Sequence, residues 1–91
     1  MKVKITDKAY TALKAAGATE NIMQELAAAV GSHPKGKYKV DTFDGLSCLG
    51  VPLSWIRDHK ADTATVMTRS EAHSLDAFAA SGGLVKIRPL F

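Results

Sequence analysis

Cysteine is scarce in this chain, which has only Cys48 among its 91 residues. A single cysteine excludes an internal disulfide framework and any zinc or iron–sulfur site built from several cysteines. No apolar run approaches the roughly 18–20 residues that a membrane span needs. The start of the chain, residues 1–5, lacks the long apolar stretch of a signal peptide. These absences predict a cytoplasmic protein without a membrane segment.

The composition is that of a folded globular protein. Hydrophobic residues make up 46% and charged residues 23%, both close to the globular average, which argues against disorder. The length predicts one compact domain, residues 1–91, with a modest core. Lys and Arg total 12 against 9 acidic residues, for a net charge of +3 and an isoelectric point near 9.2. This balance permits binding to nucleic acid or to an acidic protein.

The first third of the chain carries clear helix signals. Residues 2–5 alternate Lys and apolar side chains, which predicts a strand with one apolar face. Thr6 can cap the helix that follows, because apolar residues then recur at three- and four-residue spacing over 7–16. Thr19 caps a second predicted helix, which Gly31 ends.

The rest of the chain predicts a mixture of strands and helices. In order, these are a strand at 37–40, a helical segment at 43–60 in two pieces broken at Gly50-Val51-Pro52, a strand at 63–67, a helix that opens with the capping box Thr68-Arg69-Ser70-Glu71 and stops at Gly82-Gly83, and a strand at 84–88. The predicted order is β-α-α-β-(α-α)-β-α-β. We therefore expect an α+β domain, with a short sheet of 3–4 strands covered by 3–5 helices.

One segment, residues 46–59, has the pattern of two short helices around a turn. Gly50 is the turn glycine, Val51 is the apolar residue beside it, and Ile56 follows at a core position. The segment resembles the helix-turn-helix of MerR-like and excisionase-like winged DNA-binding domains. That resemblance implies a recognition helix in the major groove, with three polar or aromatic residues facing DNA: Ser54, Trp55 and Arg57. The same pattern also fits a ligand-free corner buried around its apolar residues.

Lysines near this segment would supply the phosphate contacts. They are Lys35, Lys37, Lys39 and Lys60. The first hypothesis is therefore a small, basic, regulatory nucleic-acid-binding module whose partner is DNA.

A second set of basic residues suggests a different partner. Lys or Arg stands opposite the apolar face in each alternating strand: Lys2, Lys4, Lys37, Lys39, Lys86 and Arg88. In one shared sheet these side chains would form a basic outer face. The alternative hypothesis is a protein-binding accessory or inhibitor protein of phage or mobile-element type, whose basic face docks on an acidic or nucleic-acid-binding surface of a larger protein. Lysines also protect sheet edges from aggregation, and a homodimer is a further option.

Catalytic signals are weak. Cys48 could pair with a histidine only if the fold brought the two together, and the spacing does not imply this. His73 and Asp76 lie three residues apart on a predicted helix, but two ligands do not make a metal site. The sequence therefore predicts no enzyme, no cofactor and no metal.

Overall fold

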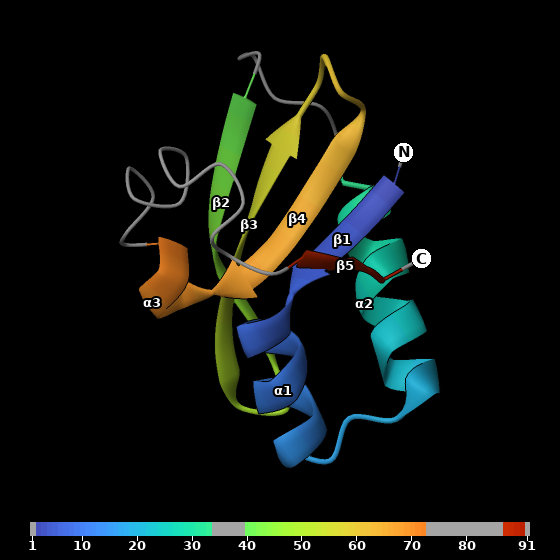
Figure 1. Ribbon diagram of the computed structural model, residues 1–91, viewed down its shortest axis with the longest axis vertical. Coiled ribbons are helices and arrows are strands. Elements are labelled where there is room, and N and C mark those ends of the chain that lie inside the picture. The colour runs from blue at the N-terminus through green and yellow to red at the C-terminus, as the bar shows by residue number, and fades with distance from the viewer. Residues whose placement is uncertain (1, 34–39, 73–86, 91) are drawn as a thin grey trace.

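The protein folds around a mixed sheet flanked by helices, as the computed structural model in Figure 1 shows. The structure describes residues 2–33, 40–72 and 87–90. Its elements, in chain order, are β1 (Lys2–Thr6), α1 (Asp7–Ala15), α2 (Glu20–Gly31), β2 (Val40–Cys48), β3 (Val51–Asp58), β4 (Thr63–Thr68), α3 (Arg69–Ala72) and β5 (Ile87–Pro89).

The sheet has the strand order β2-β3-β4-β1-β5 within the described ranges. Strands β2, β3 and β4 form an antiparallel meander, and β1 then joins β4 in parallel. β5 pairs antiparallel with β1 on the other side. The edges of the described sheet are therefore β2 and β5.

Helices α1 and α2 begin at the threonines that the sequence indicates. Thr6 Oγ1 accepts a hydrogen bond from the Ala9 N–H at 3.2 Å, and Thr19 Oγ1 accepts one from the Ile22 N–H at 3.3 Å. Each cap satisfies a backbone donor that has no partner inside its helix. Gly17 adopts φ 95° just after α1, a conformation that glycine takes without steric cost.

The predicted helical segment at 43–60 is wrong, because these residues form the β2–β3 hairpin. Cys48 pairs with Val51, which leaves Leu49 and Gly50 as a two-residue turn with φ of 52° and 79°. Positive φ at both turn residues matches the twist of the two strands it joins. Pro52 lies beyond the β3–β4 ladder, which begins at Leu53, so its missing N–H removes no bond to β4.

The predicted element order and element numbers are wrong for the same reason. Over the described residues the structure is α+β with the order β-α-α-β-β-β-α-β and a five-stranded sheet, where 3–4 strands and two extra central helices were expected. The predicted strands at 37–40 and 84–88 lie partly outside the described residues, within which β2 begins at Val40 and β5 at Ile87.

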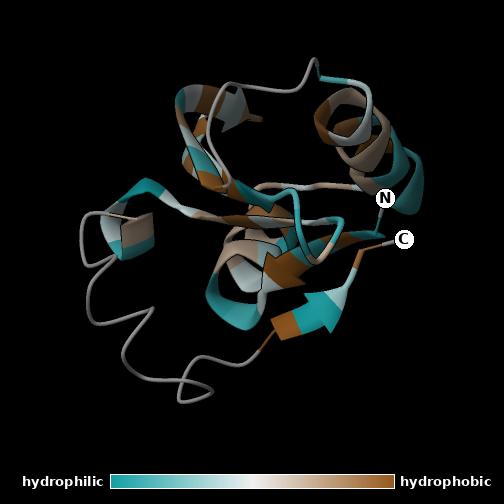
Figure 2. Cartoon of the chain, turned by 90° about the horizontal axis from the view of Figure 1, so that it is seen from above, coloured by the Kyte–Doolittle hydropathy of each residue, from teal (hydrophilic) through white to brown (hydrophobic). Residues whose placement is uncertain are grey.

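The main core lies between the sheet and helices α1 and α2. Alternate strand residues face these helices and are almost fully buried; they include Val3, Ile5, Leu53, Trp55, Ala64 and Val66. The helices contribute Leu13, Met23 and Val30, among others. Figure 2 shows the hydrophobic residues of α2 on one side of the helix and the hydrophilic residues on the other. This division is what an apolar helix face packed on a sheet requires.

The capping box at the start of α3 is confirmed. The Thr68 N–H donates to Glu71 Oε1 at 3.0 Å, and the Glu71 N–H donates to Thr68 Oγ1 at 3.2 Å. The same Glu71 oxygen accepts from Thr6 Oγ1 at 2.7 Å, so the cap also ties α3 to the end of β1. The predicted continuation of this helix to Gly82 lies outside the described residues.

None of the helices described by the structure is long and apolar enough to cross a membrane.

Candidate nucleic-acid interface

Several chain segments meet at one end of the sheet. β1 and β4 both begin there, with Lys2 paired to Thr63, and β3 ends there. β2 also begins at this end, because Val40 pairs with Asp58. The Lys2 N–H donates to the Asp62 carbonyl at 3.1 Å, which fixes the start of β1 against the β3–β4 turn. Figure 1 shows the start of β2 and the β3–β4 turn side by side.

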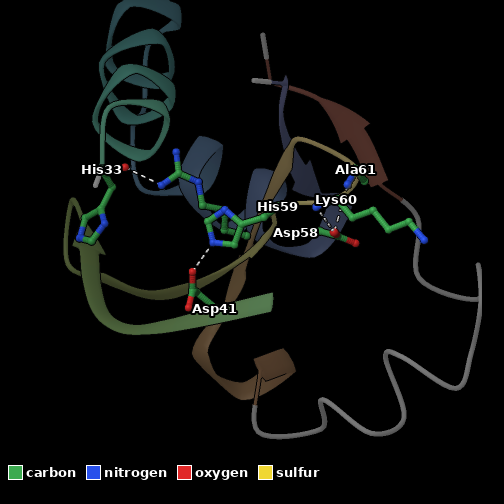
Figure 3. Close-up of polar contacts among 7 residues, drawn as sticks. His33, Asp41, Asp58, His59, Lys60 and Ala61 are labelled. Carbon is green, nitrogen blue, oxygen red and sulfur yellow. Dashed lines mark hydrogen bonds and ion pairs between the residues drawn. The ribbon is translucent and has the colours of Figure 1, made fainter. Parts of the chain in front are cut away.

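The β3–β4 turn is held by an aspartate at its first position. Asp58 Oδ1 accepts hydrogen bonds from the Lys60 N–H at 3.0 Å and the Ala61 N–H at 3.1 Å. An aspartate that binds backbone groups two and three residues ahead is a common way to close a turn. Asp62, at φ 53°, completes the reversal into β4. The Lys60 side chain is exposed and points away from the turn (Figure 3).

Beneath this turn, polar side chains bind one another on the helix-facing side of the hairpin. His59 Nε2 contacts Asp41 Oδ2, which joins the residue after β3 to β2. Arg57, directly opposite Asp41 in the register, donates from Nη1 to the His33 carbonyl just after α2 (Figure 3). These contacts join the residue after β3 to β2 and connect the end of α2 to the hairpin.

Acidic and basic side chains are mixed at this end of the sheet, where Asp62 is exposed as the lysines are. Asp41 is buried against His59, and the Asp58 carboxylate is directed at the turn's own N–H groups. Lys2 and Lys60 are exposed. We call these two lysines, together with Lys35, Lys37 and Lys39 of the segment that leads into Val40, the lysine end. The latter three lie outside the described residues, and their inclusion is a prediction from the sequence.

The three residues expected on a recognition helix lie on strand β3. Trp55 is 4% exposed and stacks on Phe43 with ring centroids 4.1 Å apart. Arg57 is 6% exposed and binds the His33 carbonyl. Ser54 is fully buried and donates to Asp44 Oδ1 at 2.6 Å. Their placement on an exposed helix is therefore corrected: all three are interior residues of a strand.

The expected basic sheet face is divided in the structure. Lys2 and Lys4 alternate with the core residues of β1 and therefore lie on the face away from α1 and α2. Arg88 pairs with the core residue Ile5, so it lies on the opposite face, where its Nε donates to Asp7 Oδ1 at 2.7 Å. Lys86 lies outside the described residues. The prediction that Arg88 shares a face with Lys2 and Lys4 is wrong.

Sequence reasoning did not find the His59–Asp41 pair or the aspartate-closed turn. The signal for the turn was present, because Asp58-His59-Lys60-Ala61-Asp62 is a short polar stretch before the β-branched run of β4. It was hidden by the helical interpretation of residues 43–60. The His59–Asp41 contact depends on the β2–β3 register, which no local pattern reveals.

Within the described ranges, no three His, Cys, Asp or Glu side chains gather in a way that could hold a metal ion. Cys48 is a free, half-buried cysteine at the end of β2. His73 and Asp76, the weak candidate pair from the sequence, lie outside those ranges.

Comparison with models of protein families, with curated proteins and with solved structures gave no match. These comparisons neither support nor refute the helix-turn-helix resemblance of residues 46–59, which the structure folds as a hairpin.

Proposed function

We propose that this protein is a non-catalytic, regulatory nucleic-acid-binding module that binds the phosphate backbone of DNA in the cytoplasm through its lysine end. One observation supports the proposal most strongly. The pairing of Val40 with Asp58 sets the start of β2 beside the turn that carries the exposed Lys60. In the sequence, Lys35, Lys37 and Lys39 immediately precede Val40, and in the structure Lys2 starts the strand hydrogen-bonded to the same turn.

The structure favours phosphate contact over reading of base edges. Arginine is the residue that reads guanine with paired hydrogen bonds. Each of the three arginines instead has an internal partner: Arg57 at the His33 carbonyl, Arg69 at the Leu46 carbonyl and Arg88 at Asp7. Among the described residues, Arg88 is exposed but bound to Asp7, and the other exposed cations are lysines, which act as point charges toward phosphate. We therefore expect binding that depends weakly on sequence and strongly on salt.

Fluorescence polarisation of a labelled mixed-sequence DNA duplex tests the proposal. If four or five phosphates are neutralised, affinity falls about 100- to 500-fold between about 50 mM and about 200 mM salt. A single-stranded oligonucleotide of the same sequence, run in parallel, separates duplex binding from a preference for single strands. Absence of binding to either DNA at the lower salt concentration contradicts the proposal.

A protein partner is the second candidate, and a different observation favours it. β2 pairs with β3 on one side only within the described sheet, and its first residue, Val40, is 51% exposed. A free strand edge can accept a strand from another protein through backbone hydrogen bonds. Because the basic sheet face is divided, the lysine end would supply the charge for an acidic partner. If the protein does not bind DNA in the titration, a protein partner becomes the preferred candidate.

A further inference from the structure

A cavity of about 490 Å³ lies between α1, α2 and the end of β5. Its apolar lining comes from Met23 of α2, which is buried, and from Pro89 and Leu90 beside β5. Tyr10 of α1 adds an aromatic wall. The cavity shares no residue with the lysine end, and its volume lies in the range typical of small-molecule sites.

Two side chains of opposite charge line this cavity, and they do not form an ion pair with each other. Lys14 near the end of α1 and Glu20 at the start of α2 both line it. Both side chains are exposed, and neither takes part in an ion pair or hydrogen bond with another described residue. The Lys14 ammonium lies 6.0 Å from the centre of the Tyr10 ring, which also lines the cavity. The Gln24 amide, one helical turn after Glu20, is likewise without a bond and also lines the cavity.

Arg88, which lies nearby, differs from these two residues because it has partners within the protein. Arg88 donates to Asp7, and its guanidinium carbon lies 4.3 Å from the centre of the Tyr10 ring. That contact fixes the Tyr10 side chain at the edge of the cavity and leaves Arg88 committed to the fold. Lys14 and Glu20 therefore remain as the charged groups available to a ligand in this cavity.

We propose that the cavity binds a free α-amino acid with an apolar side chain. Lys14 binds the ligand carboxylate, Glu20 binds its ammonium group, and the side chain packs on Met23 and Leu90. A zwitterion can bind both charged side chains at once, whereas a ligand with one charge binds only one of them, so a zwitterion is preferred. The apolar lining disfavours charged amino-acid side chains, which would lose hydration there.

Titration with L-leucine, followed by ¹H–¹⁵N NMR, tests this proposal. We expect shifts centred on Met23, Gln24 and Leu90 and a Kd on the order of 1 mM, as suits a ligand of this size. Leucinamide, which lacks the carboxylate, and 4-methylpentanoate, which lacks the ammonium group, should each bind at least tenfold more weakly. Equal binding of all three compounds, or no shift at about 10 mM leucine, ten times that Kd, would overturn the proposal.

Two variants assign the charges. Lys14→Ala should abolish the preference for leucine over leucinamide, and Glu20→Gln should abolish the preference for leucine over 4-methylpentanoate. Lys8→Ala and Glu25→Gln change exposed residues of the same two helices that do not line this cavity, so they serve as matched controls. If the controls weaken leucine binding as much as the two variants do, the assigned site is wrong.

Discussion

Replacing Trp55 with alanine should lower the free energy of unfolding by about 3–5 kcal/mol, the usual cost of deleting a large buried aromatic side chain. Trp55 is 4% exposed and packs in the main core. It stacks on Phe43, and the His33 ring meets both aromatic rings edge-on, with centroids 4.4 Å from Phe43 and 5.2 Å from Trp55. A domain of this size has a total stability of roughly 5–14 kcal/mol, so the variant loses a large share of it.

Urea unfolding followed by far-ultraviolet circular dichroism measures this effect. Trp55→Phe is the matched control, because it keeps a ring against Phe43 while removing the indole. We expect it to recover at least half of the lost stability. If Trp55→Ala changes stability by less than about 1 kcal/mol, Trp55 lies at the surface and the hairpin packing described above is wrong.

Replacing Arg57 with alanine should cost about 2–4 kcal/mol of stability, because it removes a buried side chain and leaves the part-buried His33 carbonyl without its donor. Arg57 is 6% exposed, donates to the His33 carbonyl and lies opposite Asp41 in the register. The effect is on folding and not on recognition. A folded Arg57→Ala protein should bind a DNA duplex about as tightly as the wild type.

The DNA affinity of the variant distinguishes a buried Arg57 that stabilises the fold from an arginine on a recognition helix. An arginine that reads guanine would lose affinity for its specific sequence with little change in stability. Arg57→Lys keeps the charge but not the planar guanidinium, so we expect an intermediate loss of stability. Comparison of the urea midpoints and duplex affinities of the three proteins separates the two roles. Unchanged stability with weakened DNA binding would contradict the buried position of Arg57.

The helices near the start of the chain could be predicted because their signals are local. A threonine cap precedes α1 and another precedes α2, and a glycine follows α1. The capping box of Thr68 and Glu71 was equally readable, since both partners lie within one helical turn. Both partners of such a signal are close in sequence, so the signal can be recognised before the fold is known.

The β2–β3 hairpin was not predicted because its turn has an uncommon sequence. Hairpin turns of this type favour Asn-Gly or Asp-Gly, whereas here Leu49 takes positive φ before Gly50. The apolar residues Leu49, Leu53 and Ile56 are spaced by four and three positions, which imitates a helix. In the structure, Leu53 faces the main core while Ile56 lies on the other side of the sheet, as strand alternation requires.

The candidate site was predicted only in part. Lys60 was predicted from its charge alone; the structure places it exposed on the β3–β4 turn, and its contact with phosphate stays a prediction. The division of the basic strands could not be foreseen, because the face of Arg88 depends on its pairing with Ile5. A shift of one residue in that register would have placed Arg88 beside Lys2 and Lys4.

The central claim is that the lysine end binds phosphate, and paired lysine variants test it most directly. Lys60→Ala and Lys8→Ala each remove one exposed lysine, the first at the lysine end and the second on α1. In the polarisation assay, we expect Lys60→Ala to weaken duplex binding several-fold and to reduce the salt slope by about one, while Lys8→Ala matches the wild type. Equal effects of the two variants, or a larger effect of Lys8→Ala, would contradict the claim.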